Sequence, residues 1–261
     1  MLEIKDLTIQ YGDKPPVVEN FSLSLKKGEI ITIVGESGSG KSTVLSSILG
    51  LLPNGGKIIS GDIIYNGESM LSKSLNQWRE LRGTEITMIS QDSGGTLNPI
   101  RKIGKQFVEY IQTHSKMSAK EAEEKAKDMF SKVNLPDPEI IMKSYPHQLS
   151  GGMKQRVGIA MALTFHPKII LADEPTSALD VITQAQIVKE IMDLRKKFDT
   201  SIIMVTHNLG VAAYISDKII VMQNGKIVDA GNKNEVIENP KSDYTKKLLA
   251  AVPEIGGERL V

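Results

Sequence analysis

The stretch GESGSGKS, from Gly35 to Ser42, has the residue types and the spacing of a phosphate-binding loop, GxxxxGK[ST]. It lies between a run expected to form a strand and a run expected to form a helix, which is the context that this motif requires. Its glycines let the backbone turn tightly so that several N–H groups point inward. The flanking pattern weakens the alternative, a chance glycine-rich turn.

Each side chain of this loop has an expected part in nucleotide binding. Lys41 can reach the β- and γ-phosphates, the Ser42 hydroxyl can bind Mg²⁺, and Thr43 is expected to bind a phosphate. The predicted phosphate-binding residues are Gly35, Glu36, Ser37, Gly38, Ser39, Gly40, Lys41, Ser42 and Thr43.

Three further apolar runs end in polar side chains that suit phosphate chemistry. IILADE ends in Asp173, which can hold Mg²⁺ through water, and Glu174, which can orient or deprotonate an attacking water. Gln91 follows TEITMIS and can reach a metal ion or a water, and His207 ends SIIMVTH. The alternatives are a solvated acidic pair and a packed or surface histidine. We expect all four residues at one sheet edge, because strand C-termini of a doubly wound sheet meet at the ligand crevice.

A second helix start that suits an anion lies in LSGGMKQR, from Leu149 to Arg156. Ser150, Gly151 and Gly152 precede a long amphipathic run, so backbone N–H groups and the positive end of the helix dipole are expected there. The loop from Gly35 to Ser42 can already bind the phosphates of one nucleotide. A second anion site in the same chain must therefore serve another purpose.

The rest of the chain predicts the elements that position these residues. Strands are expected for LEIKDLTIQY, GEIITIVG, GDIIYNGE, TEITMIS, KIILADE, SIIMVTH and KIIVMQNGKIVDAG, with hairpin turns at Asn66-Gly67 and Asn224-Gly225. Helices are expected for KSTVLSSILGLL, stopped by Pro53, for about 105–133, and for VITQAQIVKEIMDLRKKF. The tetrapeptide SAKE, which starts at Ser118, predicts a capping box.

These patterns predict an α/β fold, a P-loop ATPase core with a mostly parallel sheet plus an antiparallel β portion and an inserted α-helical subdomain. We expect the core to comprise 1–91 and 155–235, the inserted helical subdomain 92–154, and the C-terminal tail 236–261.

Composition excludes several classes of protein. Cysteine is absent, which excludes disulfides, thiolate metal sites and cysteine nucleophiles. The net charge of +1 and the lack of a basic tract argue against nucleic acid as the main partner. The N-terminus is not a signal peptide, and no apolar run reaches the ~20 residues that span a bilayer. We therefore expect a cytoplasmic protein whose membrane attachment, if any, comes from a partner.

Together these motifs resemble the nucleotide-binding subunit of ABC transporters. LSGGM is similar to the signature motif of that family, SALD (177–180) to the loop after the Walker B strand, Gln91 to the Q-loop and His207 to the switch histidine. The resemblance implies ATP and Mg²⁺ as ligands, with Ser42, Gln91 and Asp173 at the metal. It implies catalytic roles for Glu174, His207 and Gln91. It implies that Ser150, Gly151, Gly152 and Asp180 contact ATP and that Tyr11 stacks on the adenine. The alternative for Tyr11 is an ordinary aromatic residue at the end of a strand.

Longer stretches resemble the oligopeptide, dipeptide and nickel importer branch: TLNPIRKIG, SYPHQLSGGMKQRVGIAMAL, HPKIILADEPTSALDVITQAQI and DYTKKLLAAVP. That branch implies a head-to-tail pair of ATPase subunits, usually different, beneath two permeases fed by an extracytoplasmic binding protein. It places the chain peripherally at the cytoplasmic face of the membrane. Ser90 and Gly94-Gly95 depart from its pattern. Many peptide importers of this branch extend the C-terminus with a cysteine cluster, whereas the given sequence stops at Val261 and has no cysteine. The resemblance therefore favours nickel or a metal chelate over small peptides, although the residues themselves do not identify the solute.

Two other functions compete with this interpretation. A P-loop kinase or GTPase is disfavoured by LSGGM and SALD and by the lack of a guanine-binding NKxD motif. A soluble ABC ATPase of DNA repair or translation usually carries two ATPase domains, a long coiled coil or basic patches, and none of these occurs in the sequence.

Overall fold

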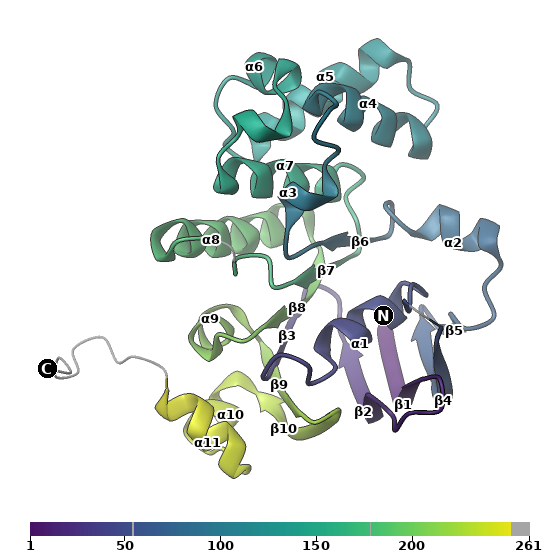
Figure 1. The fold of residues 1–261 in the computed structure, drawn as a ribbon, viewed down its shortest axis with the longest axis vertical. Coiled ribbons are helices and arrows are strands. Elements are labelled where there is room, and N and C mark those ends of the chain that lie inside the picture. The colour runs from purple at the N-terminus through teal and green to yellow at the C-terminus, as the bar shows by residue number, and fades with distance from the viewer. Residues whose placement is uncertain (54, 178, 252–261) are drawn as a thin grey trace, which may run out of the picture. The chain divides into compact units, whose positions relative to one another are not determined.

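The computed structural model of the protein describes residues 1–53, 55–177 and 179–251, and Figure 1 shows its helices and strands. The chain comprises two compact units. We name Met1–Leu71 with Met204–Val261 the phosphate-loop unit, and Ser72–Ile203 the signature unit. The division predicted from the sequence, with boundaries after 91, 154 and 235, stays a prediction, and the end of its tail lies outside the described residues.

The phosphate-loop unit contains an antiparallel sheet in the order β2-β1-β4-β5. Its strands are β1 (Leu2–Tyr11), β2 (Val18–Leu25), β4 (Gly56–Tyr65) and β5 (Glu68–Ser69). Leu2 pairs with Leu25 on one side and with Tyr65 on the other, so β1 is an interior strand of this sheet. Burial alternates along β2, as in a strand with one covered and one open face, and this strand was not among those predicted.

The same unit contains β3, the strand that runs directly into the phosphate loop, together with further strands and helices. Its further elements are β3 (Ile30–Val34), α1 (Lys41–Ile48), α9 (Leu209–Ile215), β9 (Lys218–Gln223), β10 (Lys226–Asn232), α10 (Lys233–Glu238) and α11 (Asp243–Ala250). β3 runs parallel to β9, and β10 returns antiparallel through the predicted Asn224-Gly225 turn. Both turn residues have positive φ, as a tight hairpin of this type requires.

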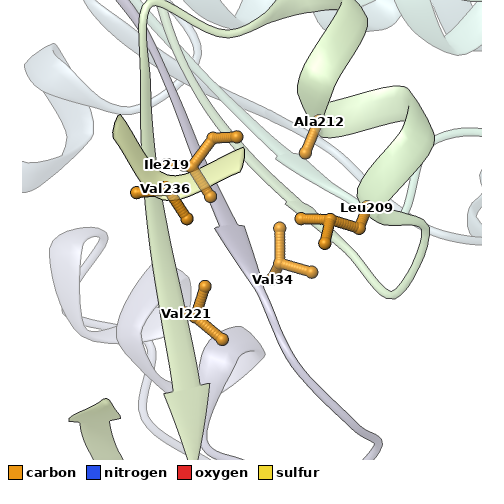
Figure 2. Packing of buried hydrophobic residues seen from close by; sticks show 6 residues of the cluster. All are labelled: Val34, Leu209, Ala212, Ile219, Val221 and Val236. Carbon is orange, nitrogen blue, oxygen red and sulfur yellow. The ribbon is translucent and has the colours of Figure 1, made fainter. Parts of the chain in front are cut away.

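A buried apolar cluster supports the end of β3 in this unit. Figure 2 shows its side chains pointing toward one another from β3, α9, β9 and α10: Val34, Leu209, Ala212, Ile219, Val221 and Val236. Tyr244, Leu248 and Leu249 of α11 pack against this cluster from outside. Val34 immediately precedes the phosphate loop, so the cluster fixes where that loop begins.

The signature unit contains β6 (Ile86–Ile89) parallel to β7 (Ile169–Asp173), and β8 (Ser201–Thr206) is the next strand of the sheet. The boundary between the two units lies inside β8, which also neighbours β3. All of β8 and nearly all of β7 are buried, which matches strands covered on both faces. The predictions from the apolar runs KIILADE and SIIMVTH are confirmed.

Helices make up the rest of the signature unit. They are α2 (Leu75–Leu81), α3 (Ser93–Thr96), α4 (Ile103–His114), α5 (Ala119–Lys132), α6 (Pro138–Lys143), the 3-10 turn η1 (Pro146–Gln148), α7 (Gly151–Leu163) and α8 (Val181–Phe198). Figure 1 shows α4, α5 and α6 grouped together, and α5 contacts the signature helix α7.

The helix predictions hold with two differences in length. Ser118 and Glu121 form the predicted capping box of α5, and its apolar face is buried. The helical pattern over about 105–133 is two helices, because α4 ends at His114 and its C-cap Ser115 is extended. α1 ends at Ile48, earlier than the predicted stop at Pro53. Gly50, just beyond the helix, has a positive φ of 61°.

Candidate functional site

Lys41 is folded back onto the loop that it belongs to. Only 4% of the residue is exposed. Its ammonium donates to the carbonyl oxygens of Gly35 at 2.8 Å and Glu36 at 2.6 Å, and to the Ser39 hydroxyl at 3.3 Å. These contacts hold a cation against the loop backbone, and a cation at this place fits the phosphates of a nucleotide.

Two glycines allow the loop to lie against its neighbours. A Cβ on Gly35 would be 2.2 Å from the Met222 carbonyl oxygen, and a Cβ on Gly40, where φ is 98°, would be 2.7 Å from that of Val17. Gly225 of the β9–β10 turn donates its N–H to the Ser39 carbonyl at 3.2 Å. The loop is therefore held by β9, β10 and the segment before β2, all within its own unit.

The first turn of α1 follows this loop and begins without a capping side chain, since Gly40 is the N-cap. Ser42 is exposed and Thr43 is half-buried in this turn. The first N–H groups of a helix have no partner inside the helix, and together with the dipole they suit a phosphate.

The other predicted residues of the phosphate-loop unit are Tyr11 and His207. Tyr11 ends β1 with its ring against Gly56, where a Cβ would lie 2.6 Å from the ring carbon Cε1. Val17 lies in the segment between β1 and β2, and its carbonyl oxygen lies close to Gly40 of the phosphate loop. His207 is exposed between β8 and Asn208, whose side chain caps α9 by accepting from Gly210 and Val211.

The signature motif forms a helix start that is already capped. Ser150 is the N-cap of α7, and its Oγ accepts the N–H of Met153 at 3.3 Å. An open cavity of about 370 Å³ lies at this start, with Ser150, Gly151, Gly152 and Asp180 among its lining residues. The structure thus brings these four predicted residues together at one cavity of the signature unit.

Asp180 has a structural task that the sequence motif alone does not reveal. It is the N-cap of α8, and its carboxylate accepts the N–H groups of Ile182 at 3.1 Å and Thr183 at 3.0 Å and the Thr183 hydroxyl at 2.7 Å. These bonds, first that from the Thr183 N–H, lower the pKa of Asp180 and keep it ionised. The spacing of Asp180 and Thr183 is the signal of this cap.

Arg156 links the signature helix α7 to α8 and also lines the cavity at the start of α7. Its guanidinium makes a bidentate pair with Glu190 of α8, at 3.2 Å from Nε and 2.7 Å from Nη2, and also donates to the Asn134 carbonyl at 3.2 Å. Burial is the main reason that the pKa of Glu190 is raised, although Arg156 opposes the shift. Sequence reasoning missed this pair, because its partners are on different helices.

Asp173, Glu174 and Gln91 follow strand ends of the signature unit, as predicted. Asp173 is the last residue of β7 and is half-buried. Glu174 has a positive φ of 43°. Its carbonyl accepts both the N–H and the hydroxyl of Ser177 at 3.2 Å, which fixes the turn after the strand. Gln91 is exposed in the turn that follows β6.

The departures from the branch pattern have a packing explanation at Gly94 and Gly95. A Cβ on Gly94 would lie 2.9 Å from the Cδ of Lys154, and one on Gly95 would lie 2.5 Å from an Asp92 carboxylate oxygen. The short helix α3 can therefore contact α7 closely. Nothing in the structure explains Ser90.

The ABC transporter family model matches residues 18–177. The chain belongs to the ABC transporter family. It is an ATP-binding, ATP-hydrolysing member, and this excludes an unrelated P-loop kinase or GTPase. Among the described residues of this ABC ATPase, no helix is long and apolar enough to cross a bilayer.

Known proteins resemble this ABC ATPase over nearly its whole length. The oligopeptide transport ATP-binding protein OppD of Bacillus subtilis is 44% identical, covering 98% of this chain and 72% of the relative. The metal-staphylopine import system ATP-binding protein CntD of Staphylococcus aureus is 41% identical, covering 98% of this chain and 94% of the relative. A dimeric post-hydrolysis structure of the cassette MJ0796 bound to ADP and Pi has a TM-score of 0.77 at 29% identity, covering 89% and 99% of the two chains.

The predicted site residues of this ABC ATPase fall into two groups. Tyr11, the loop from Gly35 to Thr43 and His207 belong to the phosphate-loop unit. The signature unit holds Gln91, Ser150, Gly151, Gly152, Asp173, Glu174 and Asp180. Within the described part of the chain, no three His, Cys, Asp or Glu side chains gather to hold a metal by themselves. Mg²⁺ instead takes one or two protein oxygens besides phosphates and waters, so a hydroxyl and a carboxylate fit it.

Proposed function

We propose that this protein is the ATP-hydrolysing, energy-coupling subunit of an ABC importer for nickel, for a metal chelate or for small peptides. The names of its relatives support both solute classes, since OppD is an oligopeptide transport protein and CntD a metal-staphylopine import protein. We propose that it works at the cytoplasmic face of the membrane, beneath two permeases that receive solute from an extracytoplasmic binding protein. No residue of the ATPase needs to touch the solute.

ATP is bound by the phosphate loop, with Lys41 turning from the loop carbonyls to the β- and γ-phosphates. Tyr11 stacks on the adenine. Ser42, Asp173 and Gln91 are the residues that would hold Mg²⁺, which when bound neutralises charge on the phosphates. Glu174 orients or deprotonates the attacking water, and His207 assists hydrolysis as the switch histidine.

The helix start at Ser150 serves the nucleotide of a second ATPase subunit, in a head-to-tail pair that is a heterodimer in the importer. The observation that carries this proposal is that Ser150, Gly151, Gly152 and Asp180 line an open cavity of about 370 Å³ within their own unit. The α7 dipole and the glycine N–H groups favour the negative γ-phosphate of the partner. Hydrolysis removes that contact and lets the subunits separate, and this can drive the permeases.

Substitution of Ser150 and Lys41 tests this pairing. Ser150→Arg fills the cavity with a bulky cation, so ATP binding by the monomer should stay nearly unchanged while ATP-induced dimerisation is lost. Lys41→Ala should weaken monomer binding itself, by about 10- to 100-fold for the lost charged hydrogen bonds. In a heterodimer, each substitution should disable a different site. The pairing model fails if Ser150→Arg weakens monomer binding as severely as Lys41→Ala.

The helical insertion, with Gln91 at its start, is the surface that docks a permease. Two adjoining cavities of about 420 and 200 Å³ lie where the insertion meets the later part of α7. They share Thr96 and Tyr110 of the insertion and Gly158 and Met161 of α7. The turn-rich stretch after Gln91 suits a segment that moves with nucleotide state. Crosslinks from this surface to a co-purified permease would support the docking, and crosslinks confined to 232–261 would contradict it.

A further inference from the structure

The C-terminal helix α11 makes a direct contact with the phosphate loop. The hydroxyl oxygen of Tyr244, in the first turn of α11, accepts the backbone N–H of Glu36 at 2.9 Å across 208 residues of sequence. Both residues belong to the phosphate-loop unit. Glu36 directly follows Gly35, so the hydroxyl holds the loop where it leaves β3.

The peptide groups of Glu36 are held from two sides. Its N–H donates to Tyr244, and its carbonyl accepts the Lys41 ammonium at 2.6 Å and the Ser39 N–H at 3.2 Å. When Lys41 turns to a nucleotide, Glu36 loses the shorter of these two carbonyl contacts. The Tyr244 contact does not involve Lys41, and it can therefore hold this part of the loop both before and after ATP binds.

The position of the Tyr244 hydroxyl is set by a rigid support. Asp229 of β10, only 5% exposed, accepts the N–H groups of Lys241 at 2.8 Å and Ser242 at 3.2 Å. The Ser242 hydroxyl then caps α11 by accepting the Tyr244 N–H at 3.2 Å. Leu248 and Leu249 pack on the cluster that contains Val34, so one face of α11 is fixed to the strand that begins the loop.

We propose that Tyr244 is a positioning residue for ATP binding, whose hydroxyl holds the phosphate loop at Glu36 in the conformation that accepts ATP. The helix α11 is then a working part of the nucleotide site. This role rests on the proposed binding of ATP phosphates by the loop from Gly35 to Ser42. Tyr244 does not touch the nucleotide and acts through the loop backbone.

The test compares Tyr244→Phe with Tyr214→Phe in the full chain. The first substitution removes one hydroxyl and keeps the ring, whereas Tyr214 is 60% exposed on α9 and serves as the matched control. Loss of one hydrogen bond at the loop should raise the Kd for ATP about three- to tenfold in Tyr244→Phe. The KM for ATP should rise by a similar factor with kcat little changed, because the chemistry groups are untouched. The control should match the unsubstituted protein.

A structural role alone would give different results. Positioning predicts faster hydrogen exchange of the Glu36 amide in Tyr244→Phe, with an unchanged melting temperature in the absence of nucleotide. An unchanged Kd, or a lowered melting temperature with unchanged exchange at Glu36, would overturn the proposal. Lys41→Ala separates the two hypotheses: if it too leaves the Kd unchanged, the loop is not the ATP site. If only Tyr244→Phe has no effect, the positioning role alone is wrong.

Discussion

The two helix starts that suit a phosphate differ in how their first turns are satisfied. α1 begins at Gly40, which has no side chain to cap it, and a buried ammonium from Lys41 lies beside it. α7 begins at Ser150, whose own Oγ accepts the Met153 N–H, and its first turn has no acidic residue. The α1 start therefore has a lysine ammonium beside a helix start without a capping side chain, whereas the α7 start offers the helix dipole and glycine N–H groups at a helix that already has its cap.

This difference fits the proposal that the two helix starts bind phosphates with separate tasks. The phosphate loop is held by close approaches from Met222, Val17 and Gly225, and its cation makes it the stronger anion site. The signature start stays capped without an anion and gains about 0.3–1 kcal/mol or somewhat more from a charge at the dipole. A contact of that strength suits subunits that pair on ATP and separate after hydrolysis.

The largest expected effect separates binding from turnover. Glu174→Gln keeps the shape of the side chain and removes its charge, so ATP binding at the phosphate loop should persist while turnover falls by about 10²-fold or more. The measurement is ATP affinity of the isolated chain beside phosphate release by the assembled transporter. Near-normal hydrolysis in the transporter would refute the role of Glu174 as base.

A smaller effect is expected when the ion pair between Arg156 of α7 and Glu190 of α8 is broken. Arg156→Met leaves Glu190 without its partner at a site where the two side chains are 15% and 11% exposed, and unfolding free energy should fall by about 3 kcal/mol. ATP-induced dimerisation should weaken, while the phosphate loop, which lies in the other unit, keeps its monomer affinity. Urea unfolding and a dimerisation assay give the two readouts.

The matched control for Arg156 is the double substitution Arg156→Met with Glu190→Met. Because both charges are then removed together, most of the lost stability should return. If the double variant is as unstable as the single one, packing of Arg156 rather than the unpaired charge explains the loss.

The sequence predicts most of the local structure, because local structure here follows local signals. The apolar runs of β7 and β8, the Asn224-Gly225 turn and the capping box at Ser118 all form as predicted. The break between α4 and α5 was not predicted, since helical periodicity continues on both sides of the extended Ser115.

The site is predictable in its motifs but not in its long-range contacts. Each of these motifs lies at the element that its pattern predicts. The phosphate loop follows β3, Asp173 and Glu174 lie at the end of β7, and the signature start begins α7. The Glu36 to Tyr244 bond spans 208 residues, and the Arg156 to Glu190 pair spans 34, so no local spacing reveals either. Such contacts depend on tertiary packing, for instance of Leu248 and Leu249 on the cluster at Val34.

The smallest expected effect is a response of the signature unit to acid. Three of the four histidines lie in this unit, and burial lowers the pKa of two of them, His114 and His166. The His114 ring contacts Tyr110 and Phe165, and the His166 ring contacts Phe198. Nearby Lys132 and Lys125 further lower the pKa of His166. Both imidazoles are therefore neutral in the folded protein near neutral pH.

A folded-state pKa below the unfolded value of about 6.5 gives stability that is present above that pH and lost as pH falls through the folded pKa. The urea midpoint should therefore fall as the pH is lowered from about 7.5 to about 5.5. It should fall less in His114→Gln, which lacks the half-buried imidazole of His114. An equal slope in His114→Gln and in the unsubstituted protein would show that acid acts elsewhere. The signature unit would then show no acid response that sets it apart from the phosphate-loop unit, and the two units would be compared by their helix starts alone.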